Sequence, residues 1–385
     1  MDQPLKPPLP PAPAYLYTEG YLAFDYGPYH PLQISRLALT HELINACGLG
    51  LPPHPVREAG LSELAEYHDR PYLEALRQAS ERPARAADPA HGLGNGDNPV
   101  FPGVFKWSAL LSGASLQAAD LVSRAGHPIA FNPAGGMHHA LAGRASGFCY
   151  LNDVVLAIRR LTAGGFRVAY VDIDAHHGDG VQWAFYDSPQ VLTISLHQHP
   201  ATLFPGTGRV EEMGRGEGLG FCLNVPLWPG TDDEIYVRCF EEVVPPALQA
   251  FAPDFLVTQL GVDSFRQDPL ANLDLTIHGF SRCLRVLKQM ARGGWIALGG
   301  GGYNVVNVAR AWTLAWALMQ GREGDLPPEM PAEFCARNSI LADERLFWDR
   351  AVHIRGRSWD RAAEEAREVV ARIKKNIFPI LQARP

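Results

Sequence analysis

Short apolar runs alternate with longer amphipathic stretches along most of this chain. The apolar runs end in Gly, Asp or Asn, and their length and composition predict strands that are buried on both faces. These strands span residues 128–132, 167–172, 191–196, 255–261 and 295–299. The stretches between them carry apolar residues at helical spacing, and they predict helices over residues 33–47, 61–80, 106–125, 152–162, 232–250, 279–292, 305–319 and 358–381.

This alternation predicts the fold class and the domain organisation. Buried strands joined by helices form a mostly parallel sheet with helices on both sides. The 385 residues contain no internal repeat and no clear linker, so we expect a flexible, proline-rich N-terminus over residues 1–14 and one α/β domain over residues 15–385. Residues 81–102, which are rich in Pro, Gly, Ala and Asp, predict a long surface loop of the kind that often carries function.

Composition argues against several classes of protein. The formal net charge of −7 disfavours a protein that binds nucleic acid through bulk phosphate attraction. No run of about 18 apolar residues predicts a membrane span, and the proline-rich start does not have the pattern of a signal peptide. The six cysteines show no Cys-x-x-Cys spacing, which disfavours a disulfide framework or a thiolate zinc site. We therefore expect a cytoplasmic protein without nucleic-acid or membrane partners, and no pattern indicates its oligomeric state.

Reactive side chains follow four of the predicted strands. Residues 128–132 lead into a Gly-Gly-Met-His-His segment, and residues 167–172 lead into Asp-Ile-Asp-Ala-His-His-Gly-Asp. Residues 255–261 lead into Asp263, and residues 295–299 lead into three further glycines and Tyr303. The carboxyl ends of parallel strands share one edge, which is where open α/β sheets bind ligands. We therefore expect the four clusters to meet there.

One of these clusters has the spacing of a metal site. Asp172, Asp174 and His176 alternate with apolar residues, and this spacing puts them on one side of an extended chain. Asp174 and His176, completed by a distant carboxylate such as Asp263, would leave a coordination position open for water and substrate, as catalytic zinc sites do. A simple polar loop at a strand end is the alternative. The equivalent positions of Asp263 and Tyr303 argue against it.

The histidine pair and Tyr303 would supply the remaining chemistry. Beside a metal ion, His138 and His139 can serve as general base and general acid, and Asp172 and Asp179 are carboxylates that could orient the two rings. Tyr303 follows four glycines, which allow close approach of the backbone. A phosphate-binding loop is the rival interpretation, but no Lys is present. We favour a phenol that donates a hydrogen bond to an oxyanion.

From about residue 17 to about residue 316, the chain resembles the zinc-dependent histone deacetylases, and among them the bacterial acetoin-utilisation-type deacetylases. The matching segments are GDNPVFPG (96–103), AGGMHHA (134–140), SGFCYLNDV (146–154), YVDIDAHHGDGVQ (170–182), LFPGTG (203–208), QLGVDS (259–264) and LGGGGYN (298–304). The resemblance implies a single three-layer, arginase-like α/β/α domain with an eight-stranded, mostly parallel sheet. It also implies removal of acetyl groups from the lysine side chains of proteins, with release of acetate.

The resemblance implies metal ions as well. Asp174, His176 and Asp263 would ligate a catalytic zinc ion, and such a set of nitrogen and oxygen donors also tolerates Fe²⁺. Family members also bind K⁺. The first potassium set implied by the resemblance is Asp172, Asp174, His176, Ser195 and Leu196, several of them through backbone carbonyls. The second set is Phe185, Ser188, Val191 and Phe221, where the local sequence at residues 186–190 departs from the family pattern.

Catalytic and substrate-binding roles follow from the same resemblance. His138 would pair with Asp172, and His139 would pair with Asp179 and do the acid–base work. Tyr303 would polarise the acetyl carbonyl together with zinc. The residues expected at the substrate are Asp97 at the rim, Gly147 through its carbonyl, Phe148 and Phe204 along the lysine methylenes in a narrow tunnel, Leu270 and Gly301. Arg36 matches a family arginine beneath the metal.

Leu270 bears on the choice of substrate. Relatives that prefer acetylated polyamines carry an acidic residue at this position, so Leu270 favours acetyl-lysine in a protein partner, with acetyl-CoA synthetase as a candidate by resemblance only. Leu270 could instead be a plain core residue. The alternative functions are an acetylpolyamine or other small-amide deacetylase, a manganese ureohydrolase of similar fold, and a non-catalytic protein that binds acetyl-lysine.

Overall fold

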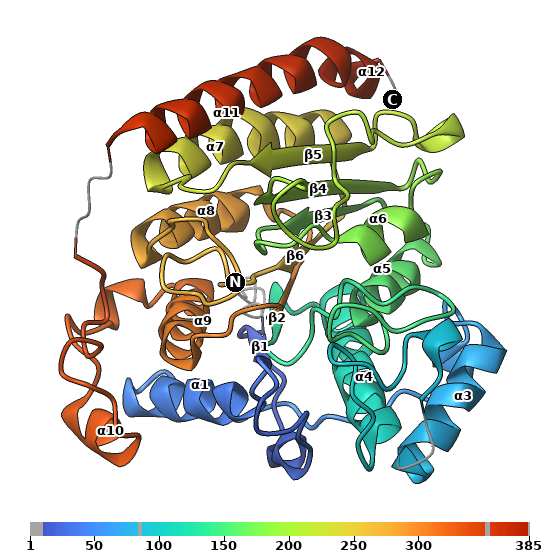
Figure 1. The fold of residues 1–385 in the computed structure, drawn as a ribbon, viewed down its shortest axis with the longest axis vertical. Coiled ribbons are helices and arrows are strands. Elements are labelled where there is room, and N and C mark those ends of the chain that lie inside the picture. Colours follow the sequence, from blue (N-terminus) through green and yellow to red (C-terminus); the bar gives the residue numbers. More distant parts are fainter. Residues whose placement is uncertain (1–10, 84–86, 351–354, 384–385) are drawn as a thin grey trace, which may run out of the picture.

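The computed structural model describes residues 11–83, 87–350 and 355–383, and these residues form a three-layer α/β/α domain (Figure 1). Its centre is a sheet in which every strand pair is parallel. The described residues contain seven strands in this sheet, not the expected eight. They are β1 (Ala14–Tyr15), β2 (Ile129–Asn132), β3 (Val168–Asp172), β4 (Val191–Gln198), β5 (Cys222–Leu227), β6 (Phe255–Gln259) and β7 (Trp295–Leu298).

The strand order is β1-β2-β7-β6-β3-β4-β5, and the register aligns the ends of the central strands. Asn132, at the end of β2, pairs with Leu298 of β7, which in turn pairs with Gln259 of β6. Gln259 pairs with Asp172 of β3. The segments that follow these four strands therefore start side by side, as the predicted parallel sheet required.

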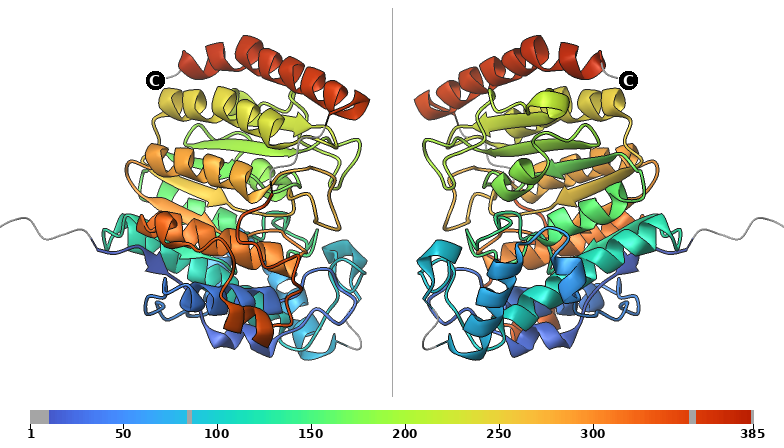
Figure 2. Two further views of the ribbon diagram at one scale, coloured as in Figure 1. Left: turned by 90° about the vertical axis from the view of Figure 1, so that its left-hand side faces the viewer. Right: turned by 90° about the vertical axis from the view of Figure 1, so that its right-hand side faces the viewer.

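Helices cover both faces of the sheet (Figures 1 and 2). One layer contains α1 (Ser35–Ala46), α7 (Asp233–Phe251), α8 (Ile277–Met290) and α9 (Val305–Gln320), which pack in the order α1, α9, α8, α7. The other contains α4 (Val104–Ser123), α5 (Asp153–Thr162) and α6 (Asp179–Ala184), with α3 (Arg70–Glu81) against α4. The remaining helices are α2 (Leu61–Leu64), α10 (Ala332–Arg337), α11 (Arg357–Asn376) and α12 (Phe378–Gln382), with short 3-10 turns at Glu19–Ala23, Pro89–His91, Gly216–Gly218 and Glu323–Asp325.

Two predicted helices prove to be interrupted at prolines. The helix expected over residues 61–80 is α2 and α3, and Pro71 lies in the first turn of α3. Proline is well tolerated in a first turn because its missing N–H has no intrahelical partner there. The helix expected over residues 358–381 is likewise divided into α11 and α12, with Pro379 in the first turn of α12.

The edge strand β5 and the short strand β1 have no counterpart among the predicted strands. β5 contains Pro226, and a proline argues against a strand in the middle of a sheet but is compatible with an edge. β5 pairs only with β4, and α11 packs along it. β1 has two residues, and Ala14 is fully buried in it. Residues 1–10 of the expected N-terminal segment and residues 84–86 of the expected loop lie outside the described residues.

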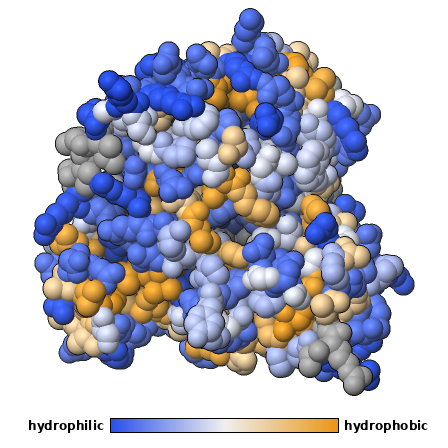
Figure 3. All heavy atoms as spheres, in the orientation of Figure 1, coloured by the Kyte–Doolittle hydropathy of each residue, from blue (hydrophilic) through white to orange (hydrophobic). Residues whose placement is uncertain are grey.

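The surface shows mixed chemistry. On the face seen in Figure 3, apolar and charged side chains are interspersed, and the face is hollowed near its middle. Among the described residues, no helix is long and apolar enough to cross a membrane.

Candidate active site

The segment after β3 and the segment after β6 bring together three side chains that could hold a metal ion. Asp174, His176 and Asp263 each offer one ligand atom, and these atoms all lie within 4.8 Å of one another. His176 Nδ1 lies 3.2 Å from Asp174 Oδ1 and 3.0 Å from Asp263 Oδ2. All three residues are buried. One imidazole nitrogen and two carboxylates suit Zn²⁺ and Fe²⁺.

The surroundings of the two carboxylates also fit a cation. Burial and the nearby Asp174 charge raise the pKa of Asp263 to about 7, because two carboxylates in one buried site repel each other. Despite burial, hydrogen bonds to Asp174 and Asp263 raise the pKa of His176 to about 10. A proton on Nδ1 therefore lies between the two carboxylates, and a metal ion held by these three residues would have to displace it. A Cβ at Gly301 would lie 2.1 Å from Asp263 Oδ2, so only glycine allows this close approach.

Backbone donors hold the metal-binding carboxylates in place. Asp174 Oδ2 accepts a hydrogen bond from Gly301 N at 2.8 Å, and Asp263 Oδ1 accepts one from Ala175 N at 2.7 Å. Gln259 Nε2 donates to the Gly136 carbonyl at 2.8 Å and lies 3.4 Å from Asp174 Oδ2. His176 N also donates to Asp174 Oδ1 at 2.9 Å, so these donors fix the orientation of both carboxylates.

The two histidines after β2 each face one carboxylate. His138 Nδ1 lies 2.8 Å from Asp172 Oδ2, and His139 Nδ1 lies 2.7 Å from Asp179 Oδ1. These are the two pairings that the resemblance implied. Tyr170 adds a hydrogen bond from its hydroxyl to Asp172 Oδ2 at 2.6 Å. The carboxylates fix the proton of each ring on Nδ1, so the Nε2 atoms are the ones available for chemistry.

The two rings differ in basicity although they are neighbours. Burial disfavours the charged form of both rings. For His138, Asp172 and Asp174 outweigh burial and raise the pKa to about 9. For His139, burial and the positive charge of His138 lower the pKa to about 4. A cation bound beside Asp174 would lower the pKa values of both rings.

Tyr303 is held at the edge of the site by its backbone and its ring. Its N–H donates to Asp268 Oδ2 at 2.7 Å, and its ring lies edge-on to Phe148, with ring centroids 5.7 Å apart. Burial and the charges of Asp263 and Asp174 raise the pKa of the Tyr303 hydroxyl well above its usual value. The phenol therefore stays protonated and can donate a hydrogen bond at neutral pH.

The buried guanidinium of Arg36 supports the glycine loop that precedes Tyr303. It donates to the Gly300 carbonyl at 2.8 Å and to the Gly302 carbonyl at 2.9 Å. Gly300 has a φ of +96° and Gly302 has a φ of +134°, conformations that strongly favour glycine. This loop ends at α9, where Asn304 caps the helix by accepting from Val306 N and Asn307 N. The positive φ angles and the hydrogen bonds to Arg36 explain the glycines of this loop without a phosphate site.

Two phenylalanines and a glycine lie against the predicted catalytic side chains. Phe204 lies 5.1 Å from His139 between ring centroids, and it is 44% exposed. Gly147 has a φ of +51°, and a Cβ there would lie 2.6 Å from His139 Cδ2 and 2.9 Å from Phe204 Cε1. Phe148 contacts Tyr303, and its carbonyl accepts from Tyr26 at 2.8 Å. These residues form an aromatic wall beside the cluster.

The other predicted substrate residues lie at the margins. Asp97 is exposed, and its carbonyl lies 3.1 Å from His30 Nε2. His30 in turn packs against Phe148, with ring centroids 4.5 Å apart. Leu270 is partly exposed and therefore not a plain core residue, and its N–H donates to Asp268 Oδ1 at 2.9 Å. The rim residues and the catalytic cluster are thus physically connected.

The two predicted potassium sets lie beside strands β3, β4 and β5. In the first set, Asp172 pairs with Ser195 across β3 and β4, and Leu196 follows in β4. Asp174 and His176 of that set belong to the metal cluster. The second set spans the turn after α6, where Ser188 N donates to the Phe185 carbonyl at 3.0 Å. Val191 opens β4 in that set, and the Phe221 carbonyl accepts from Thr193 N at 2.9 Å.

One buried carboxylate that was not among the predicted site residues, Asp153, supports the site. Asp153, at the start of α5, accepts from Met137 N at 2.7 Å, from Gly136 N at 3.0 Å and from Ser115 Oγ at 2.5 Å. It therefore fixes the loop that carries His138 and His139. Asp153 lies within the segment SGFCYLNDV, but nothing in its spacing indicates a contact with a loop 16 residues earlier.

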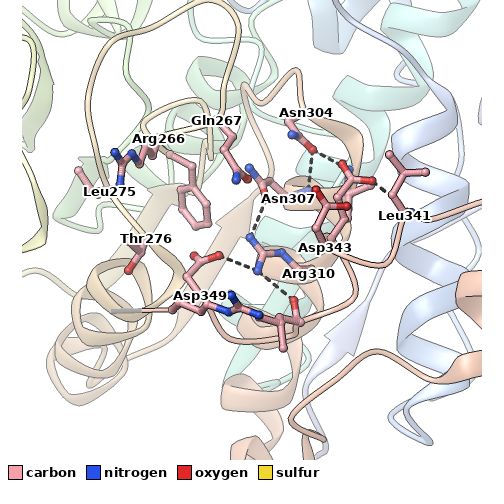
Figure 4. Close-up of a pocket in the computed structure, with 15 residues that line it drawn as sticks. Arg266, Gln267, Leu275, Thr276, Asn304, Asn307, Arg310, Leu341, Asp343 and Asp349 are labelled. Atoms are coloured by element: carbon pink, nitrogen blue, oxygen red, sulfur yellow. Dashed lines mark hydrogen bonds and ion pairs between the residues drawn. The ribbon is translucent and has the colours of Figure 1, made fainter. Parts of the chain in front are cut away.

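A separate cavity of about 580 Å³ is lined by residues that follow Asp263 and Tyr303 in the chain (Figure 4). Its walls include Arg266, which follows Asp263 closely, and Asn304, which follows Tyr303. Arg310 lies in it with an ion pair to Asp349 at 2.9 Å and a hydrogen bond to Asn307 at 2.6 Å. None of the predicted catalytic or metal-binding side chains lines this cavity.

Comparison with known proteins places this geometry in context. A family profile described as histone deacetylase domain matches residues 30–319. The chain is 39% identical to histone deacetylase B of Dictyostelium discoideum over 78% of this chain and 71% of that protein. It is 38% identical to the acetoin utilization protein AcuC of Bacillus subtilis over 82% of this chain and 84% of that protein.

Solved structures show the same fold. A histone deacetylase homologue from Aquifex aeolicus superposes with a TM-score of 0.84 and 32% sequence identity, over 94% of this chain and all (100%) of that chain. A second structure, described as a histone deacetylase homologue complexed with SAHA, gives the same TM-score of 0.84, the same 32% identity and the same coverage.

Proposed function

This chain belongs to the histone deacetylase family, whose members are metal-dependent, and we propose that it removes acetyl groups from lysine side chains of proteins. The observation that carries the proposal is the meeting of three kinds of group at one sheet edge. They are the metal triad, two histidine–carboxylate pairs and a protonated phenol. Amide hydrolysis needs these elements: an activated water, a proton carrier and an oxyanion donor.

We propose Zn²⁺ as the ion at Asp174, His176 and Asp263, with Fe²⁺ as the alternative, and the donor set supports both. When bound, the metal would lower the pKa of a water molecule and polarise the acetyl carbonyl. The chain itself holds the ligands rigidly through Gly301 N and Ala175 N. The buried position excludes bulk water, which strengthens electrostatic interactions inside.

His139 is the proposed proton carrier. Its lowered pKa leaves Nε2 unprotonated at neutral pH, so it can accept a proton from the attacking water. The same Nε2 then gives that proton to the departing lysine amine. Asp179 holds Nδ1 at 2.7 Å and stabilises the ring while it is charged. His138, whose Nδ1 lies 2.8 Å from Asp172 Oδ2, is the proposed electrostatic support beside the reacting carbonyl.

Tyr303 is the proposed oxyanion donor. Its hydroxyl would donate a hydrogen bond to the acetyl oxygen as negative charge develops there. Phe148 and Phe204 would flank the lysine methylenes, and the Gly147 carbonyl would accept the substrate amide N–H. The exposed Asp97 carboxylate would bind the backbone of the acetylated protein at the rim.

The uncharged, partly exposed Leu270 supports a protein substrate over a polyamine, because a cationic polyamine gains nothing from an apolar neighbour. Acetyl-CoA synthetase is a candidate target on resemblance to the acetoin-utilisation proteins. We also propose a potassium ion at the first set, supported by the pairing of Asp172 with Ser195. A reducing, cytoplasmic setting is supported by the six cysteines, all of them free.

The test is acetate release by purified, zinc-reconstituted protein from a panel of acyl-lysine peptides and from acetylspermidine. We expect turnover of the acetyl peptide, competition by SAHA as the solved homologue suggests, and little turnover of acetylspermidine. Faster turnover of acetylspermidine would favour the small-amide alternative. Binding of the peptide by metal-loaded protein without acetate release would favour a non-catalytic binding protein.

A further inference from the structure

His177 directly follows the metal ligand His176, yet its ring contacts a different part of the molecule. It is 2% exposed, and both ring nitrogens have partners. Nδ1 lies 2.8 Å from Thr207 Oγ1, and Nε2 lies 2.9 Å from Gln182 Oε1. The proposed reaction gives this ring no proton to carry and no metal to bind, so its burial and its two bonds require another explanation.

The partners of Gln182 fix the direction of these hydrogen bonds. Gln182 Nε2 donates to Glu212 Oε2 at 2.7 Å, so its Oε1 faces His177. That oxygen also accepts from Asn224 Nδ2 at 2.7 Å. His177 Nε2 must therefore carry the ring proton and donate it, which leaves Nδ1 to accept from the Thr207 hydroxyl. The chain of bonds runs from Thr207 through His177 to Gln182 and Glu212.

Two further side chains, those of His197 and Glu212, hold the turn of backbone that follows Thr207. His197 Nε2 lies 2.9 Å from the Gly208 carbonyl, and the Glu212 carboxylate accepts from Gly208 N and Arg209 N, each at 3.1 Å. The rings of His177 and His197 lie 4.7 Å apart. A Cβ at Gly208 would lie 2.3 Å from His197 Nε2 and 2.7 Å from His177 Cγ. The turn therefore rests directly on the two imidazole rings.

Phe204 lies three residues before Thr207 in this segment. Its ring lies 5.1 Å from the ring of His139 and close to Gly147. Residues 203–208 thus contact the polar network at one end and the proposed acid–base histidine at the other.

We propose that His177 is a positioning residue that holds residues 203–208 through the Thr207 hydroxyl, and thereby sets Phe204 at the distance that a lysine side chain needs. The inference rests on the proposed function, because it assigns the lysine methylenes to Phe204. His177 makes no contact with the reacting atoms. Its loss should weaken binding of substrate and transition state equally, which raises KM and leaves kcat nearly unchanged.

Thr207→Val and Thr207→Ser test this inference. Valine keeps the shape of threonine without the hydroxyl, whereas serine keeps the hydroxyl. We expect Thr207→Val to raise KM for an acetyl-lysine peptide about three- to tenfold, as for one lost hydrogen bond, with kcat within about twofold. Thr207→Ser should restore the KM of the wild type. Thr162→Val, a partly buried threonine in the last turn of α5, is the control and should leave KM unchanged.

The outcomes separate the inference from the proposed function. A wild-type protein that loads zinc but releases no acetate overturns both. An active wild type in which Thr207→Val keeps its KM overturns the inference alone. So does an equal rise of KM in Thr207→Ser, which would show that the methyl group, and not the hydroxyl, holds the turn. A fall in melting temperature with unchanged KM would show a structural role only and also overturns it.

Discussion

Tyr303→Phe removes one oxygen atom and leaves the ring that packs in the structure. The ring lies edge-on to Phe148 and to His176, and the backbone N–H donates to Asp268. Within the residues that the structure describes, the Tyr303 hydroxyl makes no hydrogen bond, so its removal leaves no buried partner unsatisfied. We therefore expect a melting temperature within about 2 °C of that of the wild type.

The catalytic effect of the same substitution should be large. An oxyanion donor stabilises a transition state by about 2–4 kcal/mol, which corresponds to a loss of about 30- to 1000-fold in kcat. The assay is acetate release from an acetyl-lysine peptide by zinc-reconstituted protein, with the metal content of each sample measured. Tyr29→Phe removes the same atom from a side chain that is 98% exposed and should change nothing. Turnover by Tyr303→Phe within about threefold of the wild type, at equal metal content, would refute the oxyanion role.

Three further predictions concern metal binding, stability and pH. Asp263→Asn should abolish the rise in melting temperature that Zn²⁺ gives the wild type, as differential scanning fluorimetry with and without zinc would show; an unchanged zinc shift would contradict the ligand assignment. Asp153→Ala should cost about 3 kcal/mol in urea unfolding, because it leaves Gly136 N and Met137 N without partners, whereas Asp153→Asn should cost less. Burial lowers the pKa of the His68 imidazole to about 4. The stability that the neutral ring contributes is therefore complete above about pH 6.5 and is lost between pH 6.5 and 4. The wild type should lose about 3 kcal/mol of unfolding free energy over this range, and a weaker dependence of that free energy on pH in His68→Gln would check the assignment.

The central strands of the sheet and the edge that carries the candidate site could be predicted from sequence, because they depend on local patterns. An apolar run such as residues 167–172 or 255–261 predicts both a buried strand and the point where its polar continuation begins. Parallel pairing then needs no further information to bring the ends together, and the register of Asp172 with Gln259 confirms it. The same reasoning failed for β5, because Pro226 argues against a strand unless its edge position is known.

Contacts between distant segments could not be predicted in this way. Asp153 supports the histidine loop and Asp268 supports Tyr303, yet each looks in the sequence like an ordinary acidic residue near a helix or a turn. Their roles depend on which backbone N–H groups the fold leaves without partners, and that is a property of the assembled loops. A buried N–H must be satisfied, so a carboxylate was needed at these places. The sequence does not say which one.

The adjacent histidines show the limit of residue type as a guide to chemistry. His138 and His139 have the same side chain, the same preceding loop and one carboxylate each, so the sequence gives no physical reason to assign them different roles. The structure does: His138 Nε2 also lies 3.9 Å from Asp174, whereas His139 faces the rings of His138 and His176. Nearby negative charge outweighs burial and raises the pKa of His138, whereas burial and neighbouring positive charge lower the pKa of His139. The surroundings therefore shift the pKa values of the two rings in opposite directions, which supports the proposed role of His139 as the proton carrier.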